Sequence, residues 1–219
     1  MKLKQRFSEA DLERIKSAVR TAENNISGEI VPVIVDKSGY YPTSNYKCGM
    51  VFATVSFIMV VLLDRYFIDP SHTLYYDPMF IFFVVLVSAA IGFMLPNLVQ
   101  PVQRFFISQK QMDEATRQRA ENAFLEEEVF NTRHRTGIMI FISFFEHEVI
   151  IMADRGISKV VEQKEWDAIV EDLISFIRKD QIIEGIESGI RRCGEILLEK
   201  GFRKTPDDVN ELRDDLRIS

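Results

Sequence analysis

Two long apolar runs in the middle of the chain restrict its possible folds more than any other feature. Residues 49–63 and 79–98 contain no Asp, Glu, Lys or Arg. Both runs can enter a lipid bilayer without burying a charge, which would cost a few kcal/mol or more at the bilayer centre. We therefore interpret residues 46–100 as a transmembrane hairpin with helices at about 47–65 and 78–99.

The length of the two runs leaves alternatives open. At about 1.5 Å rise per residue they form helices of roughly 22 Å and 25 Å, against a hydrocarbon core of about 30 Å. Lys47 can extend the first helix if its amine reaches the headgroups, and flanking tyrosines suit the two interfaces. The alternatives are two core helices of a soluble domain, or a hairpin that enters one leaflet. The lack of a polar face argues against the first alternative.

The charges that flank the runs predict an orientation. The connecting segment, residues 64–78, holds three aspartates and one arginine, whereas the other side of the runs carries Lys37, Lys47, Arg104 and Lys110. Lys and Arg are typical of the cytoplasmic side of a membrane. We therefore expect both termini to lie in the cytoplasm and the loop 64–78 to lie outside.

Composition restricts the possible folds and functions of the rest of the chain. The chain has 219 residues and a formal net charge of −6, so a general nucleic-acid binder is not expected. Residues 1–45 and 101–200 suffice for one soluble domain, followed by a charged tail, 201–219, for which we expect a short helix or disorder. The two cysteines, Cys48 and Cys193, offer no disulfide framework or CxxC metal site, which suits a reducing compartment.

The soluble segments alternate between helical and strand patterns. An amphipathic helix with Ser8 as its cap precedes a strand over residues 29–36, in which Pro32 predicts an edge position or a bulge. A helix over 108–130 follows the apolar runs, then a hairpin of two strands at 136–145 and 148–153, and then helices with apolar stripes that begin near Trp166 and Ile182. The pattern predicts an α/β fold.

Carboxylates at the ends of strands are the main candidates for chemistry. The sequence contains no GxGxxG, GxxxxGK[ST], GxSxG or HExxH motif. Asp36 follows the first strand and Asp154 the third, and the two lie close together if the strands are neighbours. Oxygen ligands suit Ca²⁺ or Mg²⁺. The structural alternative is that both aspartates bond turn amides, as this residue commonly does.

Several stretches occur in a characteristic order along the chain: Ala22-Glu23, Ser27–Ile30, Arg133–Gly137, Glu146, Ala153–Ile157 and Asn210–Leu212. Together they resemble the TPM domain family. The resemblance implies an α/β/α sandwich around a small central mixed sheet, here interrupted by the transmembrane hairpin. It also implies, for different members, a phosphatase label, divalent-cation binding by acidic residues near strand ends, or an accessory role in membrane complexes. Glu29, Asp154, Arg155 and Gly156 match recurrent family positions.

These observations lead to one functional hypothesis and two alternatives. We expect a TPM domain, anchored in a bacterial inner membrane and facing the cytoplasm, that acts as a binding or accessory module without enzymatic activity. Its partners are the bilayer and a membrane protein complex. Asp154, Asp36 and Glu29 are the candidate ligands of a Ca²⁺ or Mg²⁺ ion, with Arg155 and Gly156 as anion contacts. The alternatives are a metal-assisted phosphatase and a purely structural anchor.

Overall fold

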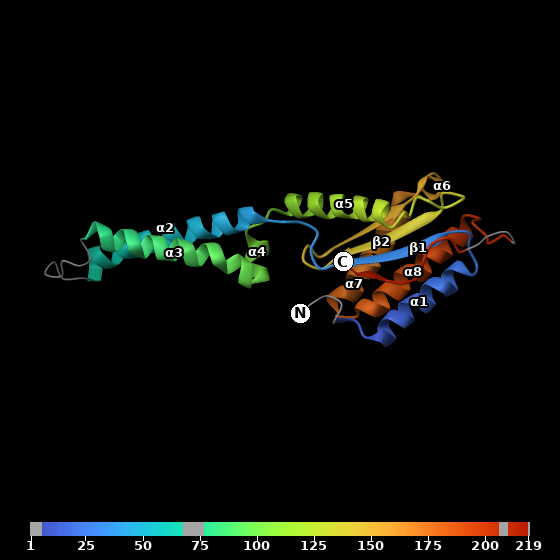
Figure 1. Cartoon of the computed structure of the whole chain (residues 1–219), viewed down its shortest axis with the longest axis horizontal. Helices are drawn as coiled ribbons and strands as arrows, with labels where there is room; N and C mark the ends of the chain where they lie inside the picture. Colours follow the sequence, from blue (N-terminus) through green and yellow to red (C-terminus); the bar gives the residue numbers. More distant parts are fainter. Residues whose placement is uncertain (1–5, 68–76, 206–209, 219) are drawn as a thin grey trace. The chain divides into compact units, whose positions relative to one another are not determined.

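The computed structural model describes residues 6–67, 77–205 and 210–218, and the chain divides into two compact units (Figure 1). One unit, which we call the α/β unit, combines Met1–Ser38 with Asp113–Ser219. The other, the hairpin unit, is Gly39–Met112. The apolar runs therefore separate two pieces of sequence that fold together.

A four-stranded mixed sheet forms the centre of the α/β unit. Its strands are β1 (Glu29–Val35), β2 (Gly137–Ser143), β3 (Glu148–Ala153) and β4 (Arg217–Ile218), in the order β3-β2-β1-β4. β1 runs parallel to β2 and to β4, whereas β3 is antiparallel to β2. The predicted mixed sheet and the predicted hairpin of its second and third strands are confirmed.

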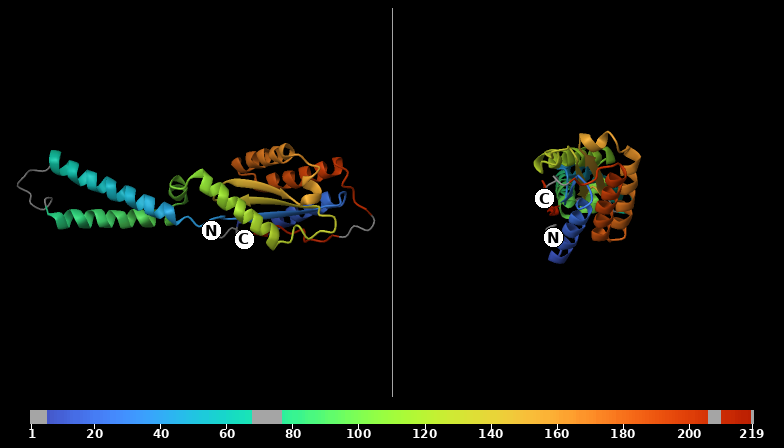
Figure 2. Two further views of the ribbon diagram at one scale, coloured as in Figure 1. Left: turned by 90° about the horizontal axis from the view of Figure 1, so that it is seen from above. Right: turned by 90° about the vertical axis from the view of Figure 1, so that its right-hand side faces the viewer.

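Helices cover both faces of this sheet (Figures 1 and 2). Side chains alternate along β1, so that Ile30 and Ile34 pack in one core cluster while Val31, Val33 and Val35 pack in another. The first cluster includes residues of α1 (Glu9–Glu23), α7 (Gln163–Arg178) and α8 (Ile182–Glu199). The second includes Ala120 and Ala123 of α5 (Gln109–Glu126). The expected α/β/α sandwich is therefore observed.

The C-terminal tail departs from the prediction of a short helix or disorder. Its last described residues form β4, which pairs with Val33 and Ile34 of β1. Leu216 and Ile218 also pack against the first core cluster, so the tail has more apolar anchors than its charged composition indicates. β1 is consequently an internal strand, and Pro32, which has no N–H to donate, lies outside the short register shared with β4.

The hairpin unit consists of α2 (Pro42–Phe67), α3 (Pro78–Leu98) and α4 (Gln100–Phe105). α2 and α3 pack closely where Gly92 meets Phe52, because a Cβ at Gly92 would lie 2.7 Å from the Phe52 Cβ. One helical turn before Gly92, the Ser88 hydroxyl donates to the Phe52 carbonyl at 3.1 Å. Small residues and interhelical hydrogen bonds are typical of helix pairs that associate in lipid.

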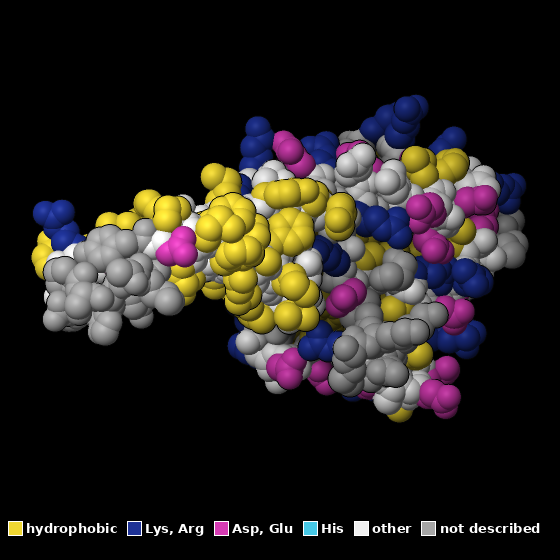
Figure 3. Space-filling view, turned by 60° about the vertical axis from the view of Figure 1, so that its left-hand side comes forward, with side chains coloured by type: hydrophobic (Ala, Val, Ile, Leu, Met, Phe, Trp, Pro, Cys, Tyr) yellow, Lys and Arg dark blue, Asp and Glu magenta, His cyan; other side chains and the backbone are white. Residues whose placement is uncertain are grey.

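Two helices of this unit are long and apolar enough to cross a membrane, Pro42–Tyr66 and Pro78–Leu98. Only 17% and 6% of their most apolar windows are buried. Figure 3 shows hydrophobic side chains gathered over the hairpin unit and charged ones over the α/β unit. A core helix of a soluble protein would be mostly buried, so the low burial of these two windows argues against two core helices of a soluble domain. The greater part of the predicted outer loop, residues 68–76, lies outside the described residues.

Candidate functional site

Asp154 directly follows β3 at a buried corner of the sheet. Its backbone N–H donates to the Gly137 carbonyl at 2.9 Å, and its Oδ1 accepts from the Arg155 N–H at 2.6 Å as the cap of α6 (Arg155–Ser158). The side chain is only 7% exposed. Because β3 is antiparallel to β2, its last residue lies beside the first residues of β2 and β1. Asp154 therefore belongs to the edge of the sheet at which β1 begins.

The second oxygen of this carboxylate is incompletely partnered. Among the described residues, no group donates a hydrogen bond to the buried Oδ2 of Asp154. Its charge partner is the Arg135 guanidinium, whose Nη1 lies 3.8 Å away, beyond hydrogen-bond distance. Buried polar atoms in native proteins almost always have a partner, and a bound ion or water supplies one where the protein does not. Asp154 therefore offers one ligand atom.

The loop before β2 is fixed against Asp154 by close backbone contacts. Gly156 donates to the Arg135 carbonyl at 3.0 Å, and a Cβ at Gly156 would lie 2.5 Å from that oxygen. Arg135 has a left-handed backbone, with φ of 57°, and its guanidinium donates to the Phe130 carbonyl at 2.9 Å. Gly156 is thus required for close packing, and it holds Arg135 next to Asp154.

The outer side of this corner is basic. Arg133, His134, Arg135 and Arg155 are all exposed, and they come from the loop before β2 and from the first residue of α6. An arginine beside a buried carboxylate can bind a phosphate or carboxylate group through its N–H donors. The corner therefore combines one buried anion with several surface cations. Both the predicted anion contacts, Arg155 and Gly156, lie here.

The predicted metal ligands are not brought together, because the topology separates them. Glu29 and Asp154 lie at the edge where β1 begins, whereas Asp36 follows the last residue of β1 at the opposite edge. Asp36 is also exposed. The expectation that Asp36 and Asp154 are neighbours is wrong because the third strand runs antiparallel to the second. Asp36 and Glu29 are separated by the full length of β1.

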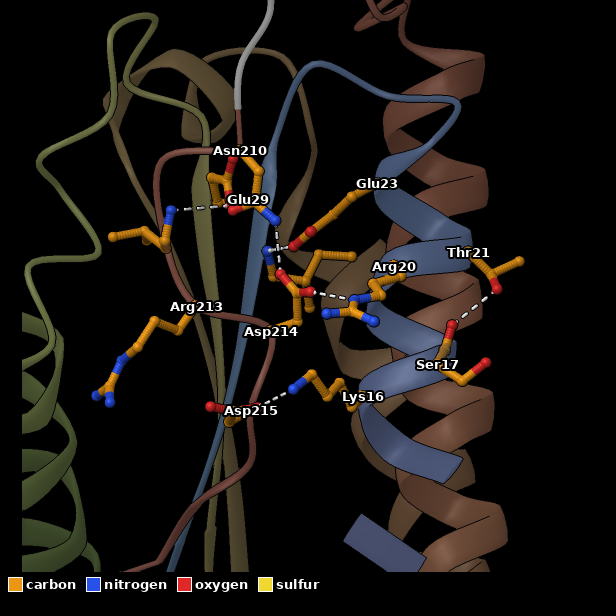
Figure 4. Close-up of polar contacts among 12 residues, drawn as sticks. Lys16, Ser17, Arg20, Thr21, Glu23, Glu29, Asn210, Arg213, Asp214 and Asp215 are labelled. Atoms are coloured by element: carbon orange, nitrogen blue, oxygen red, sulfur yellow. Dashed lines mark hydrogen bonds and ion pairs between the residues drawn. The ribbon is translucent and has the colours of Figure 1, made fainter. Parts of the chain in front are cut away.

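Glu29 holds the C-terminal tail. Its Oε1 accepts from the Glu211 N–H at 3.0 Å and its Oε2 from the Leu212 N–H at 3.3 Å. Two ion pairs also fix the same segment to α1. Arg20 pairs with Asp214 at 2.6 Å and Lys16 with Asp215 at 3.0 Å (Figure 4). Both oxygens of Glu29 thus have backbone donors, and docking of the tail is the role that its contacts show.

Glu23 and Asp214 share a polar pocket beside Glu29. The pocket has a volume of about 310 Å³ and includes Arg20, Lys204 and Asn210 in its lining. The pKa of Glu23 is raised to about 8, chiefly by burial and also by the negative charges of Glu29 and Asp214, against the hydrogen bond from the Ile30 N–H. The Glu23 carboxyl is therefore largely protonated at neutral pH.

This pocket was not predicted from sequence. Its members come from α1, from the start of β1 and from the tail, and their spacing along the chain follows no motif. The available signal was indirect, since Ala22-Glu23 and Asn210–Leu212 are among the stretches that resemble the TPM domain family. Only the docked tail makes these stretches neighbours.

A second group of carboxylates lies at the opposite edge, near Asp36. Glu146 is 1% exposed, and it accepts hydrogen bonds from the Ser38 N–H at 3.1 Å and from the Ser143 hydroxyl. Burial raises the pKa of Glu148 to about 7, with contributions from Asp113 and Glu146. These groups close the β2–β3 turn against the end of β1. Within residues 6–67, 77–205 and 210–218, no three His, Cys, Asp or Glu side chains converge as a metal-binding group.

We expect the Glu23→Gln variant to be more stable than the wild type above about pH 8. The unfolded state ionises Glu23 near its ordinary pKa of 4.5, whereas the folded state resists ionisation until about pH 8. The free energy of unfolding therefore falls as pH rises through this window, by an amount on the order of 5 kcal/mol. Glutamine keeps an oxygen for the Ile30 N–H and removes the ionisation.

The measurement is denaturant unfolding at about pH 5 and above pH 8, followed by the fluorescence of Trp166, the sole tryptophan of the chain. Glu13→Gln, an exposed position of α1, is the matched control. The gain in unfolding free energy must be larger at the higher pH for Glu23→Gln alone. A gain independent of pH would contradict the raised pKa of Glu23.

Comparison with known proteins supports the fold. Residues 101–196, less than half of the chain, match the family model described as the TPM domain. A search of curated proteins gave no match. Among solved structures, the NMR structure of the BA42 protein from the psychrophilic bacterium Bizionia argentinensis is similar, with a TM-score of 0.59 and 18% sequence identity. The similarity covers 97% of this chain and 95% of BA42. At this level of identity it shows a shared fold, and the sequence similarity to the TPM domain lies in the segment that carries α5, β2, β3 and the Asp154 corner.

Proposed function

We propose that this protein is a TPM domain protein anchored in a membrane by α2 and α3, with its α/β unit acting as a binding module in the cytoplasm. The observation that carries the proposal is the exposure of the two apolar helices. Val55, Phe82 and Val87 are 55%, 57% and 56% exposed to solvent along charge-free segments. An apolar surface of this extent is unfavourable on a monomer in water, whereas lipid would cover it.

The orientation rests on charge. Lys47, Arg104 and Lys110 belong to the end of the hairpin from which the chain enters the α/β unit, whereas the other end carries Asp64 and Asp77. Positive residues favour the cytoplasmic side.

The experiment that tests the anchor is alkaline carbonate extraction of membranes from cells expressing the full chain. Retention in the membrane pellet supports the proposal, and release into the supernatant contradicts it.

The site of the binding module is the corner around Asp154. The incompletely partnered Oδ2 of Asp154 fits one bond to a Ca²⁺ or Mg²⁺ ion, and the remaining ligands would be backbone carbonyls and water. Arg135, at 3.8 Å, competes with such an ion for the same oxygen. A bound cation would displace the Arg135 guanidinium from Asp154, so that it could bind an anionic partner group together with the neighbouring Arg155.

We expect Asp154→Asn to abolish the heat of Ca²⁺ or Mg²⁺ binding measured by titration calorimetry of the detergent-solubilised protein. Asparagine keeps the capping geometry but removes the charge that a hard cation requires. Asp36→Asn, at the opposite edge of the sheet, is expected to bind like the wild type. Absence of binding heat in the wild type would contradict the cation, whatever the variants do.

The same preparations test the phosphatase alternative. Arg135 beside Asp154 is the observation that favours it, because a guanidinium and a carboxylate-bound cation together bind phosphate. A phosphatase would release phosphate from an aryl phosphate in the presence of Mg²⁺ and lose this activity in Asp154→Asn. Equal, negligible rates for the two proteins would exclude this alternative and leave the binding module.

A further inference from the structure

The short helix α4 presents an apolar surface directly after the second apolar helix. Pro101 and Phe105 lie four residues apart on one face of α4, and Leu98 ends α3 just before the extended residue Val99 that separates the two helices. Leu98 is 78% exposed and Phe105 is 84% exposed, the largest values for apolar side chains in this part of the unit apart from Tyr40. Exposed apolar side chains of this size are stabilised by a partner that shields them from water.

Aromatic residues gather at this end of the hairpin unit, where α2 begins and α3 ends. The rings of Phe105 and Phe106 are in edge contact at 5.3 Å, and Tyr46 contacts Phe93 in the same way at 5.3 Å. Tyr40 precedes α2 and is 88% exposed. Aromatic side chains are enriched where a transmembrane element meets the headgroups. This arrangement is therefore typical of an interfacial belt.

Basic side chains accompany these rings. The Lys47 ammonium donates to the Phe106 carbonyl at 3.0 Å, which holds the end of α4 beside α2 and satisfies a helix-terminal carbonyl. Arg104 and Lys110 flank the two phenylalanines in sequence, and no Asp or Glu occurs between residues 78 and 112. Three of the four Lys and Arg residues of the hairpin unit, Lys47, Arg104 and Lys110, thus lie toward the α4 end, whereas Arg65 lies at the other end of α2. Such a charge is complementary to anionic phospholipids.

We propose that α4 lies in the headgroup layer of the membrane, with Leu98 and Phe105 inserted among the lipids and Arg104 and Lys110 contacting the phosphates of anionic phospholipids. The inference rests on the proposed membrane anchor. The exposed apolar side chains of α4 follow those of α3 directly along the chain, since Leu98 ends one helix and Phe105 ends the next, with Arg104 as the one charged residue between them. Continuity with the apolar surface of α3 and the neighbouring positive charges both favour lipid over a protein partner as the occupant of this surface.

The position of Phe105 can be measured with a thiol-attached environment-sensitive fluorophore. The native Cys48 and Cys193 are fully buried, so a cysteine placed at an exposed position is labelled selectively. Phe105→Cys is compared with Val87→Cys in the middle of α3, 56% exposed, and with Leu125→Cys on α5, 60% exposed. The full chain is reconstituted into phosphatidylcholine vesicles with and without phosphatidylglycerol.

We expect the probe at position 105 to be quenched by lipids brominated close to the headgroup more strongly than by lipids brominated deep in the chain. The probe at position 87 should show the reverse, and the probe at position 125 should respond only to a water-soluble quencher. Phosphatidylglycerol should shift the emission at position 105 to shorter wavelength, and Arg104→Gln combined with Lys110→Gln should remove that shift.

The controls separate this inference from the proposed anchor. Deep quenching at position 87 with a water-exposed probe at position 105 would overturn the placement of α4 and leave the anchor intact. A probe at position 105 that is shielded from water but not quenched by lipid would also overturn it, in favour of contact with protein. Absence of lipid quenching at position 87 would overturn the anchor and the inference together.

Discussion

Replacing Val55 and Val87 by lysine is expected to release the protein from the membrane. Each position lies near the middle of its apolar helix and is more than half exposed, so each lysine would lie at the bilayer centre. A lysine at that depth costs about 3 kcal/mol on insertion scales, and two together cost about twice as much. No nearby acidic side chain is available in the charge-free segments 49–63 and 79–98 to offset this cost.

The measurement is the fraction of protein that remains in the pellet after alkaline extraction. Leu125→Lys provides a matched control because Leu125 is equally exposed, at 60%, but belongs to α5 in the amphipathic part of the chain. We expect the control to behave like the wild type and the double variant to leave the pellet. Full retention of the double variant would mean that α2 and α3 do not cross the hydrocarbon.

Gly137→Ala is expected to destabilise the α/β unit more than any other single methyl addition at a glycine of the chain that the structure describes. A Cβ at Gly137 would lie 2.0 Å from the carbonyl oxygen of Val129 and 2.8 Å from its side chain. Gly137 is buried at the start of β2, between Glu29 of β1 and the turn at Asp154, so neither neighbouring strand can give way cheaply. Overpacking of this kind costs about 3 kcal/mol.

Denaturant unfolding followed by Trp166, which is 5% exposed in the first core cluster, measures the loss. Gly194→Ala is the control, since its Cβ would meet the Ala22 Cβ at 3.1 Å on a helix, where alanine gains about 1 kcal/mol of propensity over glycine. We expect the control to stay close to the wild type. If Gly137→Ala unfolds at the same denaturant concentration as Gly194→Ala, the contact with Val129 is not rigid.

The helices and strands were predictable because their patterns are local. The capping box of Ser8 and Asp11, the β-branched run of β1 and the apolar stripes of α7 and α8 all appear in the sequence, and each forms as expected. The Asp154 corner was predicted in part, because Asp154 is both a strand terminator and a helix cap. The residue types around Asp154 and their order in the sequence were sufficient for this part of the prediction.

Contacts between distant segments were not predictable from the same patterns. The tight turn at Phe144–His147 returns β3 antiparallel to β2, as the predicted hairpin requires. The parallel pairing of β1 with β2 was not predicted, and it places Asp36 at the opposite edge from Asp154. The charged composition of the tail predicted a short helix or disorder, but its carboxylates and cations form ion pairs with α1 and with the residue after α5, as between Arg217 and Glu127 at 2.7 Å. Each partner lies far away in sequence, so no local pattern indicated the docking.

The sequence by itself determined the two charge-free helices, the classes of the other elements and the resemblance to the TPM domain family, because side-chain polarity and backbone preference act over a few residues. Tertiary structure alone decided which carboxylates are neighbours. It placed Glu23 beside Asp214, gave both oxygens of Glu29 to the tail and left one oxygen of Asp154 without a hydrogen-bond donor among the described residues. Burial and proximity set the charge state and the partners of a carboxylate, and both are properties of the folded chain.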